Sequence, residues 1–132
     1  MWLPARQLGP LVKSEWIKPG THINAIGADA PGKEELEPEL LRRAKIVVDN
    51  IEQASHSGEI NVPWSKGIIK WPEAVSCTLG EVIDGLKKGR ETDEEITIFD
   101  STGLAIQNIA TARLVFEKAQ KSKEFLPTEW SS

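Results

Sequence analysis

The feature that most constrains this chain is the alternation of short β-branched runs with helical segments. Runs typical of strands lie at 21–27, 45–49 and 96–100, since β-branched residues favour extended backbone. Each run is followed, after a loop rich in glycine, proline or polar residues, by a segment with helical signals, at 37–43, 78–89 and 103–121. Alternation at this spacing predicts an α/β fold: a parallel sheet of about three strands, crossover helices and a long C-terminal helix.

Local signals fix some element boundaries. Thr78 and Glu81 have the spacing of a capping box, and the apolar residues that follow repeat with a helical period up to Gly89. Residues 50–72 contain several glycines and prolines and are expected to form mostly loop. The 132 residues fit one domain.

Composition removes several classes of function. The net charge of −4 argues against a nucleic-acid or anionic-membrane partner, and no apolar run is long enough to span a bilayer. Cys77 is the single cysteine, and only two histidines accompany it. An internal disulfide and a structural metal site are therefore not expected, and the chain is expected to be cytoplasmic.

The loop from Gly27 to Glu34 lies where the first strand ends, the side of an α/β sheet on which ligands bind. It nearly matches the Gly-x-x-x-x-Gly-Lys-Ser/Thr phosphate loop, but Glu34 replaces the hydroxyl that holds Mg²⁺. Asp29 would also bring a carboxylate among the phosphates, so this interpretation is disfavoured. Asp29 itself either supports the turn or exchanges protons with an amine or imine, and the residues alone favour the turn.

A second polar turn, Asp100 to Gly103, lies where the last strand ends. Ser101 and Thr102 are both residues that cap helices, and this structural role is favoured on sequence alone. The alternative is that their hydroxyl and backbone groups contact a ligand at the same edge of the sheet. No Gly-x-Gly-x-x-Gly turn, the usual pyrophosphate-binding signature, follows any strand.

These motifs and their surroundings resemble the ornithine cyclodeaminase/mu-crystallin family, most closely its archaeal-type alanine dehydrogenases. The similarity extends from about residue 4 to 120, and the GADAPGKEEL and FDSTGLAIQ blocks are specific to it. The resemblance implies a partial Rossmann-like sheet that uses NAD or NADP and a small amino- or imino-acid substrate. It also implies that Asp29 donates and accepts the proton, which reverses the preference for a turn role.

The same resemblance assigns the remaining site residues. Cofactor-binding positions are expected at Ile26, Gly27, Ala28, Asp29, Lys33 and Ser101. Thr102, together with Asp29, is expected to face the substrate. Residues 1–132 would then form the C-terminal half of an NAD(P)-binding domain, without the substrate and dimerisation domain and the Gly-rich half. The chain is therefore expected to be inactive alone, with a complementing N-terminal half or a homo-oligomer as partner; the alternative is a folded, non-catalytic remnant or interaction module.

Overall fold

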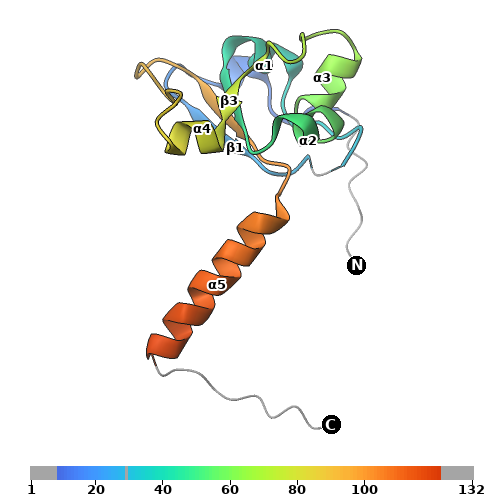
Figure 1. Cartoon of the computed structure of the whole chain (residues 1–132). Helices are drawn as coiled ribbons and strands as arrows, with labels where there is room; N and C mark the ends of the chain where they lie inside the picture. The colour runs from blue at the N-terminus through green and yellow to red at the C-terminus, as the bar shows by residue number, and fades with distance from the viewer. Residues whose placement is uncertain (1–8, 29, 123–132) are drawn as a thin grey trace.

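The computed structural model describes residues 9–28 and 30–122, and Asp29 lies outside the described residues. Strands and helices alternate along most of the chain (Figure 1). The elements are η1 (Ser14–Trp16), β1 (His22–Ala25), α1 (Pro38–Arg43), β2 (Lys45–Val48), α2 (Ile51–His56), α3 (Asn61–Ser65), β3 (Val75–Thr78), α4 (Leu79–Ile83), β4 (Thr97–Asp100) and α5 (Ala105–Ser122).

The strands form one four-stranded parallel sheet in the order β1-β4-β2-β3. The predicted α/β class and parallel sheet are therefore confirmed. The last strand, β4, lies between β1 and β2, so Ala25, Asp100 and Val48 stand side by side at the carboxyl edge. The additional strand, β3, was not predicted; it is short and lies at one end of the sheet, where it pairs only with β2.

One face of the sheet carries the hydrophobic core. Alternate residues of the central strands, including Ile46, Val48 and Ile98, are fully buried there because successive strand side chains point to opposite faces. Helix α1 packs onto this face through Leu40 and Leu41, and α2 and the start of α3 add further apolar groups. Pro38 opens α1 at the first helical positions, where its missing N–H has no partner to lose. Burial of this face anchors the carboxyl edge of the strands.

The interval 50–72 differs from the expected loop, because it contains α2 and α3. Both helices are too short for a helical period to be visible in the sequence. Helix α2 is capped by Asn50, whose side chain accepts a hydrogen bond from the Gln53 N–H. The capping box at Thr78 is confirmed. Helix α4 nevertheless ends at Ile83, earlier than its apolar pattern predicted.

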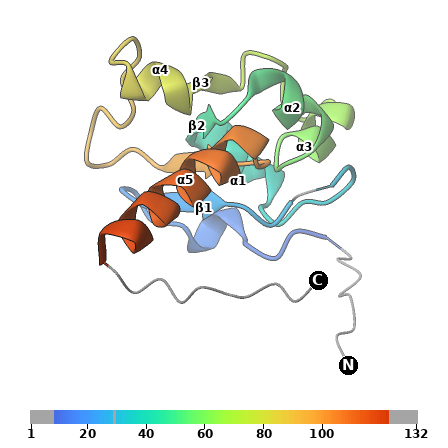
Figure 2. The same cartoon turned by 60° about the horizontal axis from the view of Figure 1, so that its bottom comes forward.

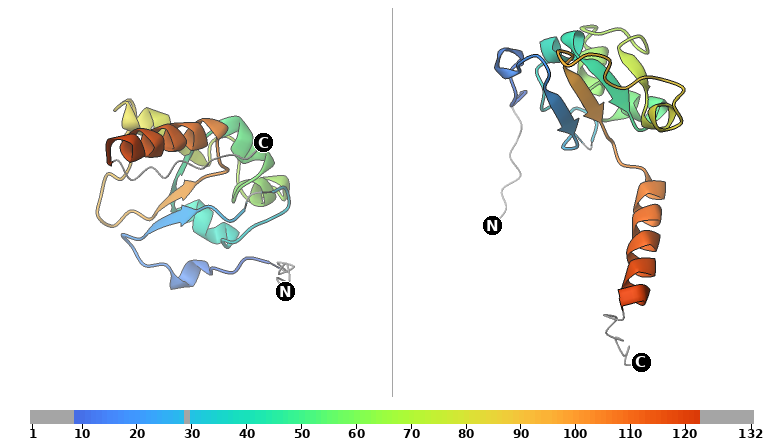
Figure 3. Two further views of the ribbon diagram at one scale, coloured as in Figure 1. Left: turned by 90° about the horizontal axis from the view of Figure 1, so that it is seen from below. Right: turned by 90° about the vertical axis from the view of Figure 1, so that its left-hand side faces the viewer.

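Helix α5 projects away from the sheet and from α1–α4 (Figures 1 and 3). None of its residues is buried, and large apolar side chains such as Ile106, Ile109 and Phe116 are at least half exposed. In Figure 2, with the bottom of the molecule turned forward, α5 lies in front of the sheet and α2 and α3 lie to its right. The second face of the sheet carries a hollow of about 330 Å³ that is open to solvent. Val47 and Phe99 are among the residues that line it. Parallel sheets are normally covered on both faces.

Candidate functional site

Three strands bring polar loops to one edge of the sheet. Chain segments 26–28, 49–50 and 101–103 follow β1, β2 and β4 directly. The Ser101 N–H donates to the Ala25 carbonyl at 3.0 Å, which places the start of the third loop beside the start of the first. The two loops in which the sequence predicted a site are thus neighbours. Asp29, the predicted proton-transfer residue, lies in the first loop but outside the described residues.

The described residues of the first loop differ in what they can offer a ligand. The side chain of Ile26 is 65% exposed, and Gly27 is exposed beside it. Ala28 is only 3% exposed, so little of its surface is available to a ligand. A β-carbon at Gly27 would meet the Glu35 carboxylate, so a larger residue here would displace that side chain. Lys33 is exposed.

The start and the end of the first loop are both held by the segment that follows α2. The N–H of Gly58 donates to the Ala28 carbonyl at 2.7 Å and so anchors the peptide group that joins Ala28 to the next residue. Farther along, the Glu59 carboxylate accepts from the backbone N–H groups of Glu35 (3.0 Å) and Leu36 (2.8 Å). The loop therefore depends on a buried acidic side chain rather than on local turn chemistry alone.

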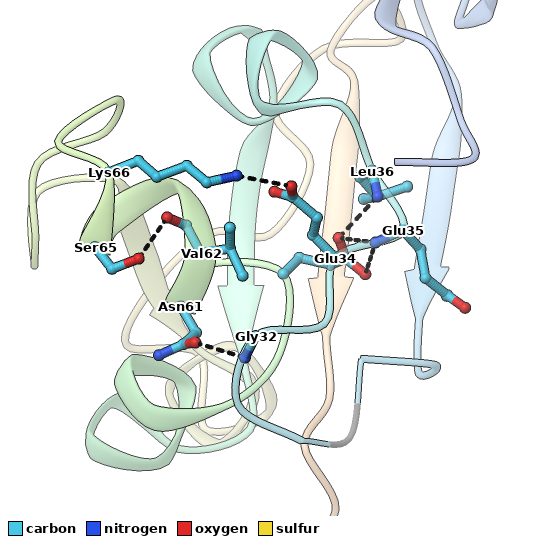
Figure 4. A network of polar contacts seen from close by, with 9 residues as sticks. Gly32, Glu34, Glu35, Leu36, Asn61, Val62, Ser65 and Lys66 are labelled. Atoms are coloured by element: carbon cyan, nitrogen blue, oxygen red, sulfur yellow. Dashed lines mark hydrogen bonds and ion pairs between the residues drawn. The ribbon is translucent and has the colours of Figure 1, made fainter. Parts of the chain in front are cut away.

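Contacts with α3 complete this support (Figure 4). The Asn61 side chain accepts from the Gly32 N–H at 3.2 Å, and Lys66 forms an ion pair with Glu34 at 3.1 Å. The nucleotide-triphosphate loop, already disfavoured by the sequence, is disfavoured further, because no helix starts directly after Lys33; α1 begins only at Pro38. A phosphate loop needs the helix N-terminus directly behind its lysine.

Two buried carboxyl groups lie beneath this loop, and neither forms an ion pair with a cation among the residues that the structure describes. Asp100 is 1% exposed and Glu59 is 0% exposed. Burial raises the pKa of Asp100 to about 7, helped by the negative charges of Glu59 and Asp49 and opposed by backbone hydrogen bonds. Burial likewise raises the pKa of Glu59, against the backbone hydrogen bonds of the loop. Asp100 Oδ2 accepts from the Glu59 N–H at 3.1 Å, whereas its Oδ1 has no hydrogen-bond partner within the described ranges.

The loop at residues 101–103 is held by Asp49 and does not cap a helix. The hydroxyls of Ser101 and Thr102 both bind the Asp49 carboxylate, at 3.1 Å each. The next helix, α5, begins only at Ala105, so the capping role favoured by the sequence alone is wrong. Both residues remain half-buried and so keep part of their surface at the edge of the sheet.

Cys77 and His22 lie outside the three loops at this edge. Cys77 is buried in β3, and burial raises the pKa of its thiol, so it is not activated as a nucleophile. His22 starts β1, at the opposite end of the strand, where it bonds Thr97. Among residues 9–28 and 30–122, no cluster of three His, Cys, Asp or Glu side chains could hold a metal ion. Within the same residues, no helix combines the length and apolar character that a membrane crossing requires.

Sequence reasoning missed four residues that shape the site: Asp49, Gly58, Glu59 and Asp100. Two of them carried a usable signal, because Asp49 and Asp100 each end an apolar run at the carboxyl end of a predicted strand. Carboxylates in that position meet at the same edge of a parallel sheet. Gly58 and Glu59 lie in a segment expected to be loop, and nothing in the sequence links them to the first loop.

Comparison with known proteins places this geometry in a defined family. Residues 3–123 match the family model described as ornithine cyclodeaminase/mu-crystallin. Over 116 residues the chain is 66% identical to an alanine dehydrogenase of Archaeoglobus fulgidus, which covers 88% of this chain but 35% of that protein. A Δ1-pyrroline-2-carboxylate reductase of Bacillus cereus is 42% identical over 110 residues, 82% of this chain and 34% of that protein.

Comparison with solved structures agrees with these sequence matches. An archaeal alanine dehydrogenase dimer with bound NAD superimposes with a TM-score of 0.80 and 60% identity, over 93% of this chain and 38% of that one. The Thermococcus litoralis Δ1-pyrroline-2-carboxylate reductase, in complex with NADH and L-proline, gives 0.78 and 41%, over 86% and 35%. This chain therefore spans about a third of the length of the relatives that it matches.

Proposed function

The chain belongs to the ornithine cyclodeaminase/mu-crystallin family, and from that premise we propose that it is the C-terminal part of the cofactor domain of an NAD(P)-dependent amino-acid dehydrogenase or a cyclodeaminase. The observation that carries the proposal is the adjacency of the β1 and β4 loops at the carboxyl edge, fixed by the Ser101–Ala25 hydrogen bond. Ligands of open α/β sheets bind at this edge. The alanine dehydrogenase and reductase relatives were solved with NAD and NADH, respectively.

The residues at the edge fit the nicotinamide end of such a cofactor. The exposed Ile26 offers an apolar surface for a flat ring, and Gly27 leaves the backbone accessible. Ser101 and Thr102 add half-buried hydroxyls. The diphosphate end of the cofactor has no such site here, since no Gly-x-Gly-x-x-Gly turn occurs in the 132 residues. We therefore assign that end to a complementing N-terminal portion and propose that the chain alone is inactive.

In this proposal Asp29 moves the proton. A bound nicotinamide dinucleotide supplies the hydride acceptor or donor. As the substrate C–H electron pair leaves as hydride, the amino nitrogen must lose a proton, and a carboxylate at the carboxyl end of β1 is suited to accept it. The anchored Ala28 carbonyl supports this role, because it belongs to the peptide bond that leads into Asp29. Lys33 is assigned to cofactor binding and Thr102 to the substrate.

The test is to coexpress the full chain with the remaining, N-terminal part of the A. fulgidus relative, hereafter the coexpressed pair. The pair should reduce NAD⁺ or NADP⁺ in the presence of L-alanine, or release ammonia from L-ornithine, and each component alone should do neither. A pair that copurifies without either activity would contradict the proposal. The choice between the two amino acids and the two cofactors is read from the same assay.

A non-catalytic interaction module is the second candidate, and the exposed apolar side chains of α5 favour it. The same side chains fit a surface that the N-terminal portion would cover, because exposed apolar patches mark interaction sites. The two candidates differ in cofactor binding. Sub-millimolar affinity of the chain alone for NAD(H) would contradict a non-catalytic module. With a single, buried cysteine, we further propose a cytoplasmic location.

A further inference from the structure

Asp49 directly follows β2, and its carboxylate accepts five hydrogen bonds. Oδ2 accepts from the hydroxyl of Ser101 (3.1 Å) and from the backbone N–H groups of Thr102 (3.0 Å) and Gly103 (2.9 Å). Oδ1 accepts from the Thr102 hydroxyl (3.1 Å) and from the N–H of Asn50 (2.8 Å). One carboxylate therefore fixes both the backbone and the hydroxyls of this turn.

The carbonyl side of the same turn is held by a second residue. The Gln53 side-chain amide, on α2, donates to the carbonyls of Gly103 (3.1 Å) and Thr102 (3.5 Å). The turn is thus held by its N–H groups on one side and by its carbonyls on the other. The hydroxyl oxygens occupy defined positions before any ligand arrives, which is the condition for a preorganised site.

The direction of these hydrogen bonds determines what the hydroxyls can offer. A carboxylate only accepts hydrogen bonds, and a hydroxyl has one hydrogen to donate. The hydrogens of Ser101 and Thr102 therefore point toward Asp49, and the lone pairs that remain are available at the half-buried surface. Toward a ligand, both hydroxyls are hydrogen-bond acceptors and not donors.

We propose that Asp49 is a positioning residue that fixes Ser101 and Thr102 as acceptors, so that this turn selects ligand groups bearing N–H donors. A primary carboxamide or an amine satisfies the turn, and a group of the same shape that only accepts hydrogen bonds does not. The inference rests on the proposed function, which brings a nicotinamide carboxamide and an amino-acid nitrogen to this edge. Beyond the proposed function, it states that this turn accepts hydrogen bonds from the ligand and that Asp49 sets this direction.

The test compares two reduced dinucleotides by fluorescence titration of the coexpressed pair. NADH carries a carboxamide, and its 3-acetylpyridine analogue replaces the amide nitrogen with a methyl group. A hydrogen bond accepted from the carboxamide should favour NADH about fivefold to tenfold in Kd. In Asp49→Ala the freed hydroxyls can rotate and donate to the ketone, so the preference should fall below about twofold. Ser101→Ala should reduce it similarly and serves if the first variant does not fold.

Gln53→Ala is the matched control, because it loosens the same turn without freeing the hydroxyls. It should weaken both dinucleotides to the same extent and keep the preference for NADH. A preference that survives in Asp49→Ala or Ser101→Ala, or that is lost equally in Gln53→Ala, would overturn the inference while leaving the proposed function intact. Failure of the unsubstituted pair to bind either dinucleotide would overturn the proposed function and this inference with it.

Discussion

Replacing Asp100 with asparagine should make the fold more stable at pH 8 but not at pH 4. In the unfolded chain the pKa of this carboxyl is near its ordinary value of 3.8, whereas in the folded protein its pKa is about 7. Between these values the folded state holds a proton that the unfolded state has released, so stability falls as pH rises and the loss is complete above about 7. Asparagine cannot ionise and escapes this loss.

The size of the effect follows from the burial of the group. At 1.36 kcal/mol per pKa unit, the difference between 3.8 and about 7 corresponds to roughly 4 kcal/mol. The amide retains an acceptor for the Glu59 N–H and places a second polar group where Oδ1 has no partner among the described residues. Because an unpaired buried group costs about 1–3 kcal/mol, the expected net gain at pH 8 is roughly 1–3 kcal/mol.

Urea unfolding of the full chain, followed by tryptophan fluorescence at pH 4 and pH 8, measures this difference. The quantity to compare is the free energy of unfolding of the variant minus that of the unsubstituted chain at each pH. This difference removes the contribution of all other titrating groups. Asp84→Asn is the matched control, because that carboxyl is exposed at the end of α4. A difference for Asp100→Asn that is the same at both pH values would refute the argument that a buried, uncompensated carboxyl supports the loop.

Three further substitutions probe the fold and the loop support, each by urea unfolding. Gly58→Ala should lower the free energy of unfolding by about 2–4 kcal/mol, because φ is +83° and the new β-carbon would lie 2.7 Å from the Asp100 carboxylate oxygens. Its control, Gly67→Ala, with φ +68° in open space, should lower it by only about 1 kcal/mol. Equal losses in the two variants would count against the clash. Leu40→Ala, at a fully buried position, should cost about 2–5 kcal/mol, and a loss under about 1 kcal/mol would mean that α1 does not anchor the core. Thr78→Ala should cost about 1 kcal/mol and speed amide hydrogen exchange in the first turn of α4; unchanged exchange would argue against the capping box.

Much of the architecture could be predicted because it is encoded locally. The three β-branched runs form β1, β2 and β4, and Thr78 caps its helix as its spacing indicates. The run Val75–Thr78 was missed because its apolar residues alternate with the polar Ser76 and Thr78, so it carries little of the apolar pattern. Helices α2 and α3 were missed because five or six residues are too few for a helical period to emerge.

The location of the site could be predicted from the sequence, but the residues that hold its loops could not. Both polar loops follow strands that the sequence identified, so their meeting at one edge followed from the parallel sheet. The residues that hold these loops act over long separations, as Asp49 does on Thr102 and Glu59 on Leu36. Such pairs depend on the strand order β1-β4-β2-β3, in which the last strand is inserted between two earlier ones. No local pattern encodes that insertion.

The most direct measurement of the central proposal is a single-turnover reduction of NAD⁺ by L-alanine, followed at 340 nm, in the coexpressed pair with Asp29→Asn. If the Asp29 carboxylate takes up the proton at the edge formed by β1 and β4, the rate of the chemical step should fall about 100-fold or more, while the Kd for NADH changes little. A variant that reduces NAD⁺ at the rate of the unsubstituted pair would contradict the account.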